Sequence, residues 1–99
     1  MSDELALRRA MTAASRIKAI LEDEIVAGAL DAIEAELRAS WESSQPDDSV
    51  SRENAYRMFR AARAFRSRLE MLLNDGAVAR AVLEGNEAQR RRTWETEHD

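Results

Sequence analysis

AYRMFRAARAFRSRLEML, residues 55–72, is the stretch of sequence that decides the fold. Its apolar side chains recur at alternating intervals of three and four residues, at Ala55, Met58, Ala62, Phe65, Leu69 and Leu72. This spacing is typical of the contact seam of a coiled coil, which runs along one side of an α-helix. We therefore expect a helix here, and we expect a second apolar surface to cover its seam.

The preceding stretch predicts a partner for that helix. Its apolar residues are Val26, Leu30, Ile33, Leu37 and Trp41, separated by steps of four, three, four and four. Between the two helices lies a polar connection, Ser43 to Ser49, whose Pro46 forbids a continuous helix. The pattern predicts an antiparallel helical hairpin. Its interface, within one chain or between copies, is expected to contain Leu30, Ile33, Leu37, Trp41, Met58, Phe59, Phe65, Leu69 and Leu72.

The rest of the chain also reads as helix, so the predicted fold is all-α, a single helical domain with helices flanking the hairpin. We expect helices over about 3–23 and 24–43, a linker over 44–49, and helices over about 50–74 and 77–95, the last with a mobile end. Acidic residues and a glycine predict a break between Asp23 and Gly28. Ser49 or Ser51 can cap the third helix, and Gly76 is suited to end it.

Composition favours self-association. The chain has 99 residues, and eighteen of the residues counted as hydrophobic are alanines, so large apolar side chains are few. Small helical chains with a thin core commonly gain stability by burying surface against copies of themselves. We therefore expect a homo-oligomer.

Several classes of protein are excluded or disfavoured. The absence of cysteine excludes disulfides, thiolate metal sites and cysteine nucleophiles. The longest apolar run, Ile25 to Leu30, is too short to cross a membrane, and the N-terminus lacks the pattern of a signal peptide. We therefore expect a protein that acts inside a cell and has no membrane partner.

The net charge of −4 is unevenly distributed. Residues 1–45 carry five basic and nine acidic groups, whereas residues 46–75 carry six arginines and five acids. A dedicated reader of duplex DNA usually has a strongly basic domain, so the acidic total argues against that class. Local basic surfaces remain compatible with weak binding of nucleic acid.

Arginines on the third helix allow two interpretations. The candidates for contact with nucleic-acid phosphates are Arg57, Arg60, Arg63, Arg66 and Arg68, all outside the predicted seam. Alternatively, these arginines pair with acidic residues of the second helix, namely Asp31, Glu34, Glu36 and Glu42, and so give the hairpin complementary charges. The sequence leaves both interpretations open.

The end of the chain is polar apart from one large aromatic side chain. Arg90, Arg91, Arg92 and Trp94 are candidates for a partner-binding tail, because Trp and Arg dominate interface hot spots. The same residues are equally compatible with a frayed helix end. Glu95 and His98 have a spacing found in di-iron bundles, but such sites need further ligands facing inward, so we predict no metal site here.

We predict no catalytic residues and no cofactor. The only histidine is His98, the three glycines are scattered and form no phosphate-binding loop, and no serine lies in a nucleophile elbow. None of the carboxylates stands in an apolar stripe where burial would shift its pKa. The chain is therefore interpreted as a non-enzyme.

Short segments resemble small helical proteins of tailed-phage and gene-transfer-agent gene clusters. They are Ala29 to Leu37 with Trp41, Pro46 to Asp48, Arg52-Glu53, Arg68 to Glu70, and Asp75 to Ala79. Size and hairpin design also resemble small terminase subunits, whose helical core forms a ring that presents viral DNA to the packaging motor.

The resemblance implies a DNA-packaging accessory, in the cytoplasm of a bacterial host or in a phage assembly intermediate. The hairpin would form the oligomer, and the segment after Gly76 would contact the large terminase or the portal protein. The first 45 residues show no helix-turn-helix, so only weak, nonspecific DNA contact is expected. Two alternatives remain, a virion-assembly protein (scaffold, chaperone or head-tail factor) that binds protein alone, and a helical adaptor for a host protein.

Overall fold

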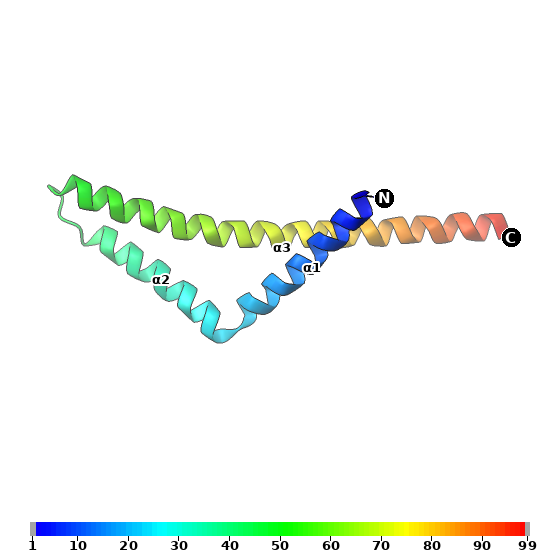
Figure 1. Cartoon of the computed structure of the whole chain (residues 1–99), viewed down its shortest axis with the longest axis horizontal. Helices are drawn as coiled ribbons and strands as arrows, with labels where there is room; N and C mark the ends of the chain where they lie inside the picture. Colours follow the sequence, from blue (N-terminus) through cyan, green and yellow to red (C-terminus); the bar gives the residue numbers. More distant parts are fainter. Residues whose placement is uncertain (1, 99) are drawn as a thin grey trace. The chain divides into compact units, whose positions relative to one another are not determined.

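The structure is a computed structural model that describes residues 2–98, with three α-helices and, in that range, no strand (Figure 1). The helices are α1 (Ser2–Glu22), α2 (Glu24–Glu42) and α3 (Ser49–His98). This confirms the predicted all-α class. The helices form two compact units: the crossing unit joins α1 up to Lys18 with α3 from Met71 onward, and the pairing unit spans Ala19–Glu70.

The predicted break between the first two helices lies at Asp23. Its carboxylate accepts hydrogen bonds from the backbone N–H groups of Ile25, at 2.9 Å, and Val26, at 3.1 Å. Both N–H groups belong to the first turn of α2 and would otherwise lack a partner, so Asp23 acts as the N-cap. Gly28 lies inside α2 and does not interrupt it.

Asp48 ends the linker and caps α3. Its carboxylate accepts a hydrogen bond from the backbone N–H of Ser51 at 3.1 Å, and its carbonyl accepts one from Arg52 N–H at 3.1 Å. The prediction that Ser49 or Ser51 provides the cap is therefore wrong. The hydrogen bond from the Ser51 backbone also holds the pKa of Asp48 below its usual value, because it stabilises the ionised carboxylate.

Helix α3 continues through Gly76, so the predicted helix end at this glycine and the separate helix over 77–95 are both wrong. Gly76 is buried, and none of the glycines described has a positive φ. A Cβ atom added at residue 76 would overlap the Cβ of Ala14 and lie 3.2 Å from the Ala10 carbonyl oxygen. Glycine is thus used here for a close approach of α1 to α3, rather than for a left-handed helix end.

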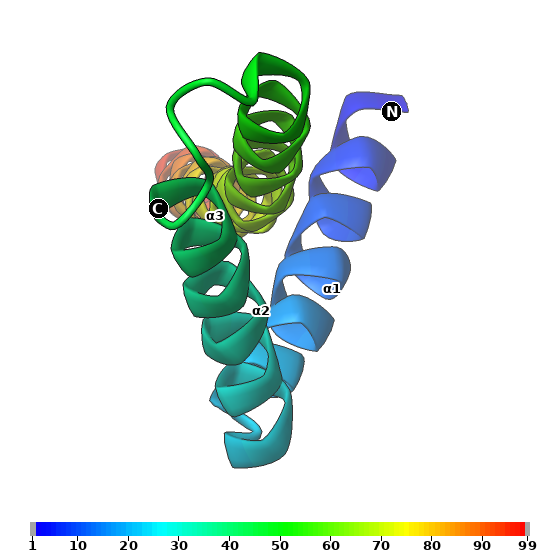
Figure 2. The ribbon, with the colours of Figure 1, turned by 90° about the vertical axis from the view of Figure 1, so that its left-hand side faces the viewer.

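In the pairing unit, α2 lies beside the first part of α3 (Figures 1 and 2). Trp41, near the end of α2, meets Tyr56 and Phe59 near the start of α3, with ring centroids 5.1 and 6.0 Å apart. Further from the linker, Asp31 of α2 meets Arg66 of α3 at 2.8 Å. The contacts therefore follow the reversed order of two helices that run in opposite directions.

The side of α3 that faces α2 is rotated around the helix axis from the predicted seam, by about half of the angle between successive residues. Its buried and half-buried residues again follow steps of three and four, at Arg52, Ala55, Phe59, Ala62, Arg66 and Leu69. The placement of Met58 and Phe65 in this seam is therefore wrong, since they are 58% and 57% exposed. The helix is turned so that Phe59 stacks on Trp41 and Arg66 reaches the acids of α2.

The core is sparse. Of the residues whose side chains are described, only Ala55, Phe59, Ala79 and Leu83 are buried, and α2 contributes none. Ile33, predicted at the interface, is 48% exposed, whereas Leu30, Leu37 and Trp41 are half-buried. A chain with so few buried side chains gains little free energy from hydrophobic burial within one molecule.

The crossing unit is held mainly by small side chains. Ala10 and Ala14 of α1 lie against Gly76 of α3. Beyond this crossing, Glu4 interacts with Arg8 at 3.2 Å and with Arg90 at 3.7 Å. The hydrogen bond from Arg8 and the charge of Arg90 hold the pKa of Glu4 below its usual value.

Candidate functional site

The five arginines predicted to contact phosphate do not form one surface. Arg66 forms ion pairs with Asp31 and Glu34 of α2, and its side chain is only 29% exposed. The hydrogen bond to Glu34 raises the pKa of Arg66, so this guanidinium is held in its charged form. For Arg66, the structure therefore agrees with the alternative interpretation, in which arginines pair with acids of the second helix.

Two further arginines also have partners on their own molecule. Arg57 forms an ion pair with Glu53 at 2.7 Å, one helical turn earlier on α3. Arg68 has an interaction partner as well. Both side chains are on exposed parts of the helix, where such pairs are screened by water and contribute little to stability.

The remaining two arginines, Arg60 and Arg63, lie in what we call the basic–aromatic surface, made of Arg38, Tyr56, Phe59, Arg60 and Arg63. The Arg60 guanidinium lies 5.9 Å from the Tyr56 ring centroid, and its Nη1 donates a hydrogen bond to the Tyr56 hydroxyl at 3.1 Å. From α2, the Arg38 guanidinium lies 5.1 Å from the Phe59 ring. Aromatic rings thus hold two of its three guanidinium groups in place.

This surface has an open hollow and uncompensated positive charge. Phe59, Arg60, Arg63, Ala64 and Ser67 line the hollow. Within residues 2–98, none of the surface's three arginines forms an ion pair with a carboxylate. Guanidinium groups that are fixed but not neutralised are suited to contact phosphate oxygens.

Arginines dominate the chemistry of the basic–aromatic surface. Its titratable side chains are arginines, which stay charged, and one tyrosine. In the part of the chain that the structure describes, no three His, Asp or Glu side chains are grouped so as to hold a metal ion. Its three guanidinium groups are able to bind an anion.

A second surface of the pairing unit is apolar. Ile33, Met58 and Phe65, which we call the apolar flank, are all about half exposed. Met58 and Phe65 are seven residues apart and so lie on one side of α3. Ile33 directly precedes Glu34, and Phe65 directly precedes Arg66, the two residues that form an ion pair. In helices that run in opposite directions, residues one position before a facing pair turn to the same side, so Ile33 joins Met58 and Phe65.

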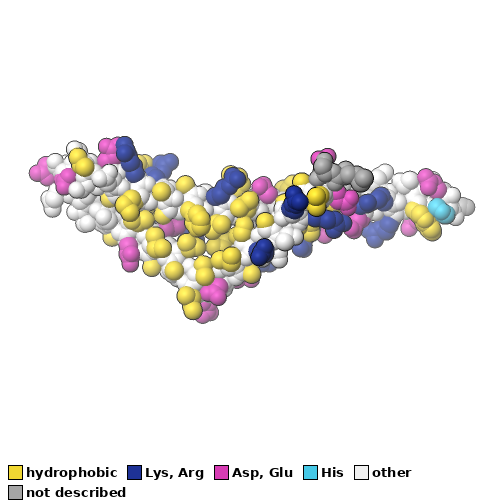
Figure 3. Space-filling model, in the orientation of Figure 1, with side chains coloured by type: hydrophobic (Ala, Val, Ile, Leu, Met, Phe, Trp, Pro, Cys, Tyr) yellow, Lys and Arg dark blue, Asp and Glu magenta, His cyan; other side chains and the backbone are white. Residues whose placement is uncertain are grey.

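The two surfaces lie on opposite sides of the α2–α3 pair. Met58 and Arg60 are two residues apart on α3, as are Arg63 and Phe65, and at about 100° per residue each step of two turns a side chain most of the way around the helix. Figure 3 shows apolar side chains gathered over α2 and the first part of α3 on the face in view. One side is therefore suited to apolar contact and the other to contact with anions.

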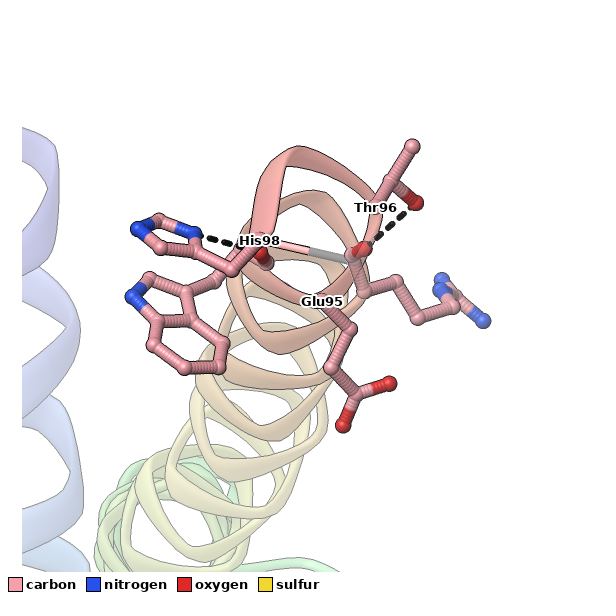
Figure 4. Close-up of a pocket in the computed structure, with 5 residues that line it drawn as sticks. Glu95, Thr96 and His98 are labelled. Atoms are coloured by element: carbon pink, nitrogen blue, oxygen red, sulfur yellow. Dashed lines mark hydrogen bonds between the residues drawn. The ribbon is translucent and has the colours of Figure 1, made fainter.

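The predicted partner-binding tail forms the end of α3. Trp94 is 60% exposed, and its ring stacks on His98 with the centroids 4.2 Å apart. His98 Nδ1 donates a hydrogen bond to the Trp94 carbonyl oxygen at 2.8 Å, which Figure 4 draws as the dashed line at the His98 ring. Arg90 is paired with Glu4, while Arg92 donates to the Gln89 side chain at 2.8 Å.

Sequence reasoning missed Arg38 and Gly76. Arg38 lies four residues after Glu34, a spacing at which Glu and Arg side chains commonly pair along one helix. The structure instead pairs Glu34 with Arg66 and sets Arg38 against Phe59. For Gly76, the alanines of α1 were the available signal, because a glycine opposite small side chains permits a close helix crossing.

Comparison with protein-family models, curated proteins and solved structures finds no match to this chain. None of the helices described is both long and apolar enough to span a lipid bilayer.

Proposed function

We propose that this chain is a non-enzymatic, oligomeric protein of the DNA-packaging accessory type. In this proposal the α2–α3 pair is an antiparallel helical hairpin whose apolar flank contacts other copies of the chain. The basic–aromatic surface contacts nucleic-acid phosphates weakly and without sequence preference. The observation that most directly supports this proposal is that the apolar flank and the basic–aromatic surface lie on opposite sides of the α2–α3 pair.

The sparse core supports self-association. Four buried side chains are few for a chain of this size, and Ile33, Met58 and Phe65 expose about half of their apolar surface. Transferring such surface out of water contributes about 25 cal/mol per Å². Association through this flank would supply burial that a single molecule lacks.

Three arginines without an acidic partner support the nucleic-acid contact. Arg38 and Arg60 hold their guanidinium groups against aromatic rings, and Arg63 lines the hollow beside them, a combination that suits phosphates and bases. The acidic total charge restricts this contact to low affinity. Of the five predicted arginines, only Arg60 and Arg63 stay in the proposed surface.

The packaging role itself follows from the resemblance of short segments to small helical phage and gene-transfer-agent proteins. By that analogy the partners are copies of the chain, nonspecific DNA, and a large terminase or portal protein. The setting would be bacterial cytoplasm or a phage assembly intermediate. The tail with Arg90 to Arg92 and Trp94 would engage a protein partner.

Light scattering and gel retardation test the proposal together. We expect a mass of several copies, and retardation of DNA at about 50 mM salt that weakens steeply as salt increases, because counterions compete for the arginines. Replacing Arg38, Arg60 and Arg63 with alanine should weaken DNA binding alike for all sequences. The control replaces Arg57 and Arg68, two exposed arginines of the same helix that already have partners within the molecule.

Self-association without DNA retardation would favour the alternative, a virion-assembly protein such as a scaffold, chaperone or head-tail factor that binds only protein. The exposed apolar flank supports this second candidate as well. A monomer at all concentrations would overturn the packaging proposal and would favour a helical adaptor or a chaperone.

A further inference from the structure

The side of α3 that α1 covers continues past the end of the helix crossing. Gly76, Ala79 and Leu83 are buried on this side, and Arg90 pairs with Glu4 of α1. Trp94 follows Arg90 by four residues and so lies on the same side, one turn further along. It is 60% exposed, so this side of α3, which is polar after Leu83, carries one uncovered tryptophan near its end.

Hydrogen bonds within the helix stabilise the last turns of α3. The Thr93 and Thr96 hydroxyls donate to the Gln89 and Arg92 carbonyls at 3.0 and 2.9 Å, and the His98 ring stacks on Trp94. The indole is therefore presented on an ordered helix, and fixing it costs little further entropy on binding. We call residues 90–98 the terminal segment.

Charge indicates which surface the terminal segment suits. It begins with three consecutive arginines, and within residues 2–98 Arg91 forms no ion pair. Residues 52–68 of α3 carry six arginines and one glutamate, which would repel the three arginines of the terminal segment. Helix α2, over residues 24–42, carries five acids and one arginine. The acidic helix also contributes Ile33 to the apolar flank.

Glu36 supplies the acidic group nearest to that flank along α2. It lies three residues after Ile33 and therefore on the same side of the helix. It is exposed, and it is absent from the ion pairs within the described chain. An apolar residue with an unpaired acid one turn away complements a tryptophan with an unpaired arginine nearby.

We propose that the terminal segment of one molecule docks on the apolar flank of a second copy, with Trp94 against Ile33 and Phe65 and Arg91 beside Glu36. This inference rests on the self-association in the proposed function and names the surfaces that perform it. Trp94 and Phe65 belong to one continuous helix, so a contact between them requires two molecules.

The contact would join two different surfaces, so each molecule could donate its terminal segment to one neighbour and accept that of another. Such heterologous contacts propagate into rings or open chains of copies, unlike the closed pair made by a two-fold interface.

Mixing two variants tests this arrangement. Trp94→Ala removes the donor, and Phe65→Asp blocks the acceptor at an exposed position, so each variant alone should associate much more weakly than the natural chain. Their equimolar mixture keeps one intact donor and one intact acceptor, and it should form a complex of two molecules. Native mass spectrometry identifies that complex, and circular dichroism checks that both variants remain helical.

Other outcomes overturn the inference in recognisable ways. If Phe65→Asp abolishes association but Trp94→Ala does not, copies pair flank to flank, and self-association survives without the terminal segment. If both variants associate like the natural chain, another surface joins the copies. If the natural chain is itself monomeric, the proposed function fails together with the inference.

A charge exchange tests the predicted ion pair. Glu36→Arg and Arg91→Glu should each weaken association, and their combination in one chain should restore it, because the attractive pair is rebuilt in reverse. Glu42→Arg is the matched control, since it makes the same charge change on the opposite side of α2. Trp94→Ala should weaken association about 30-fold, as expected of an interface hot spot. Additive effects without restoration would overturn the Glu36–Arg91 contact.

Discussion

The two compact units bring helices together by different means. In the pairing unit, bulky rings and an ion pair fill the space between α2 and α3, with Phe59 and Arg66 at the contact. In the crossing unit, Gly76 and Ala14 let two backbones approach closely. A seam with steps of three and four therefore does not determine packing by itself, since the size of the seam residues sets how near the helices come.

Replacing Phe59 with alanine should have the largest effect on this contrast. The ring is 8% exposed and stacks on Trp41, so its loss should lower the free energy of unfolding by about 3 kcal/mol. Phe65→Ala is the matched control, because that ring is 57% exposed and should cost less than about 1 kcal/mol. Urea denaturation measures both, and equal losses would contradict the shifted seam.

Gly76→Ala should destabilise the crossing unit, although alanine normally favours a helix. The overlap with Ala14 should outweigh the gain of about 1 kcal/mol in helix propensity and leave a net loss of about 1–2 kcal/mol. Gly28→Ala and Gly85→Ala are controls with no neighbour within 4 Å, and each should be neutral or stabilising. A stabilising Gly76→Ala would show that α1 does not approach α3 at this residue.

Asp23→Ala should have a smaller effect, on the start of α2. The variant loses two backbone hydrogen bonds that cap the helix, at a cost of about 1 kcal/mol. Asp23→Asn keeps an oxygen acceptor and should recover most of that loss. Thermal melting followed by circular dichroism at 222 nm compares the three chains, and no difference between alanine and asparagine would argue against this cap.

The pH dependence of the melting temperature should reveal how much Asp48, the N-cap of α3, contributes to stability. The pKa of Asp48 is lowered in the folded chain, so the carboxylate stabilises the fold above the usual carboxyl pKa. This contribution is lost as the pH falls through the lowered value. Asp48→Asn should therefore melt earlier than the natural chain at neutral pH, and the difference should shrink on acidification. A constant difference would contradict the assignment.

Residue patterns predicted the helices better than the contacts between them. The break near Asp23 and the Pro46 linker follow from local chemistry, because charge repulsion, capping and the missing proline N–H act within a few residues. The seam depends on rotation of a whole helix. By spacing alone, Met58 and Phe65 fit the seam as well as Phe59 and Arg66 do. Only the contacts with Trp41 and Glu34 of α2 decide between the two sets.

The same limit applies to the candidate site. Which arginines stay uncompensated depends on where acids of another helix lie, and the sequence could not distinguish Arg63 from Arg66. Gly76 illustrates the reverse case, since its local signal indicated a helix end, but contact with α1 gives it another role. Local propensity therefore identified the glycine as special without revealing why.

The forked contact of Arg66 with Asp31 and Glu34 also sets the axial offset of α2 along α3. Sliding either helix by one turn, about 5.4 Å, would move the Arg66 guanidinium away from both carboxylates. The half-buried charges of Arg66 and Glu34 would then be left without partners. Apolar ridges tolerate such slippage far better than a two-pronged ion pair does. The contact thus fixes the position of α2 along α3, and with it the arrangement of the basic–aromatic surface and the apolar flank, to which both helices contribute.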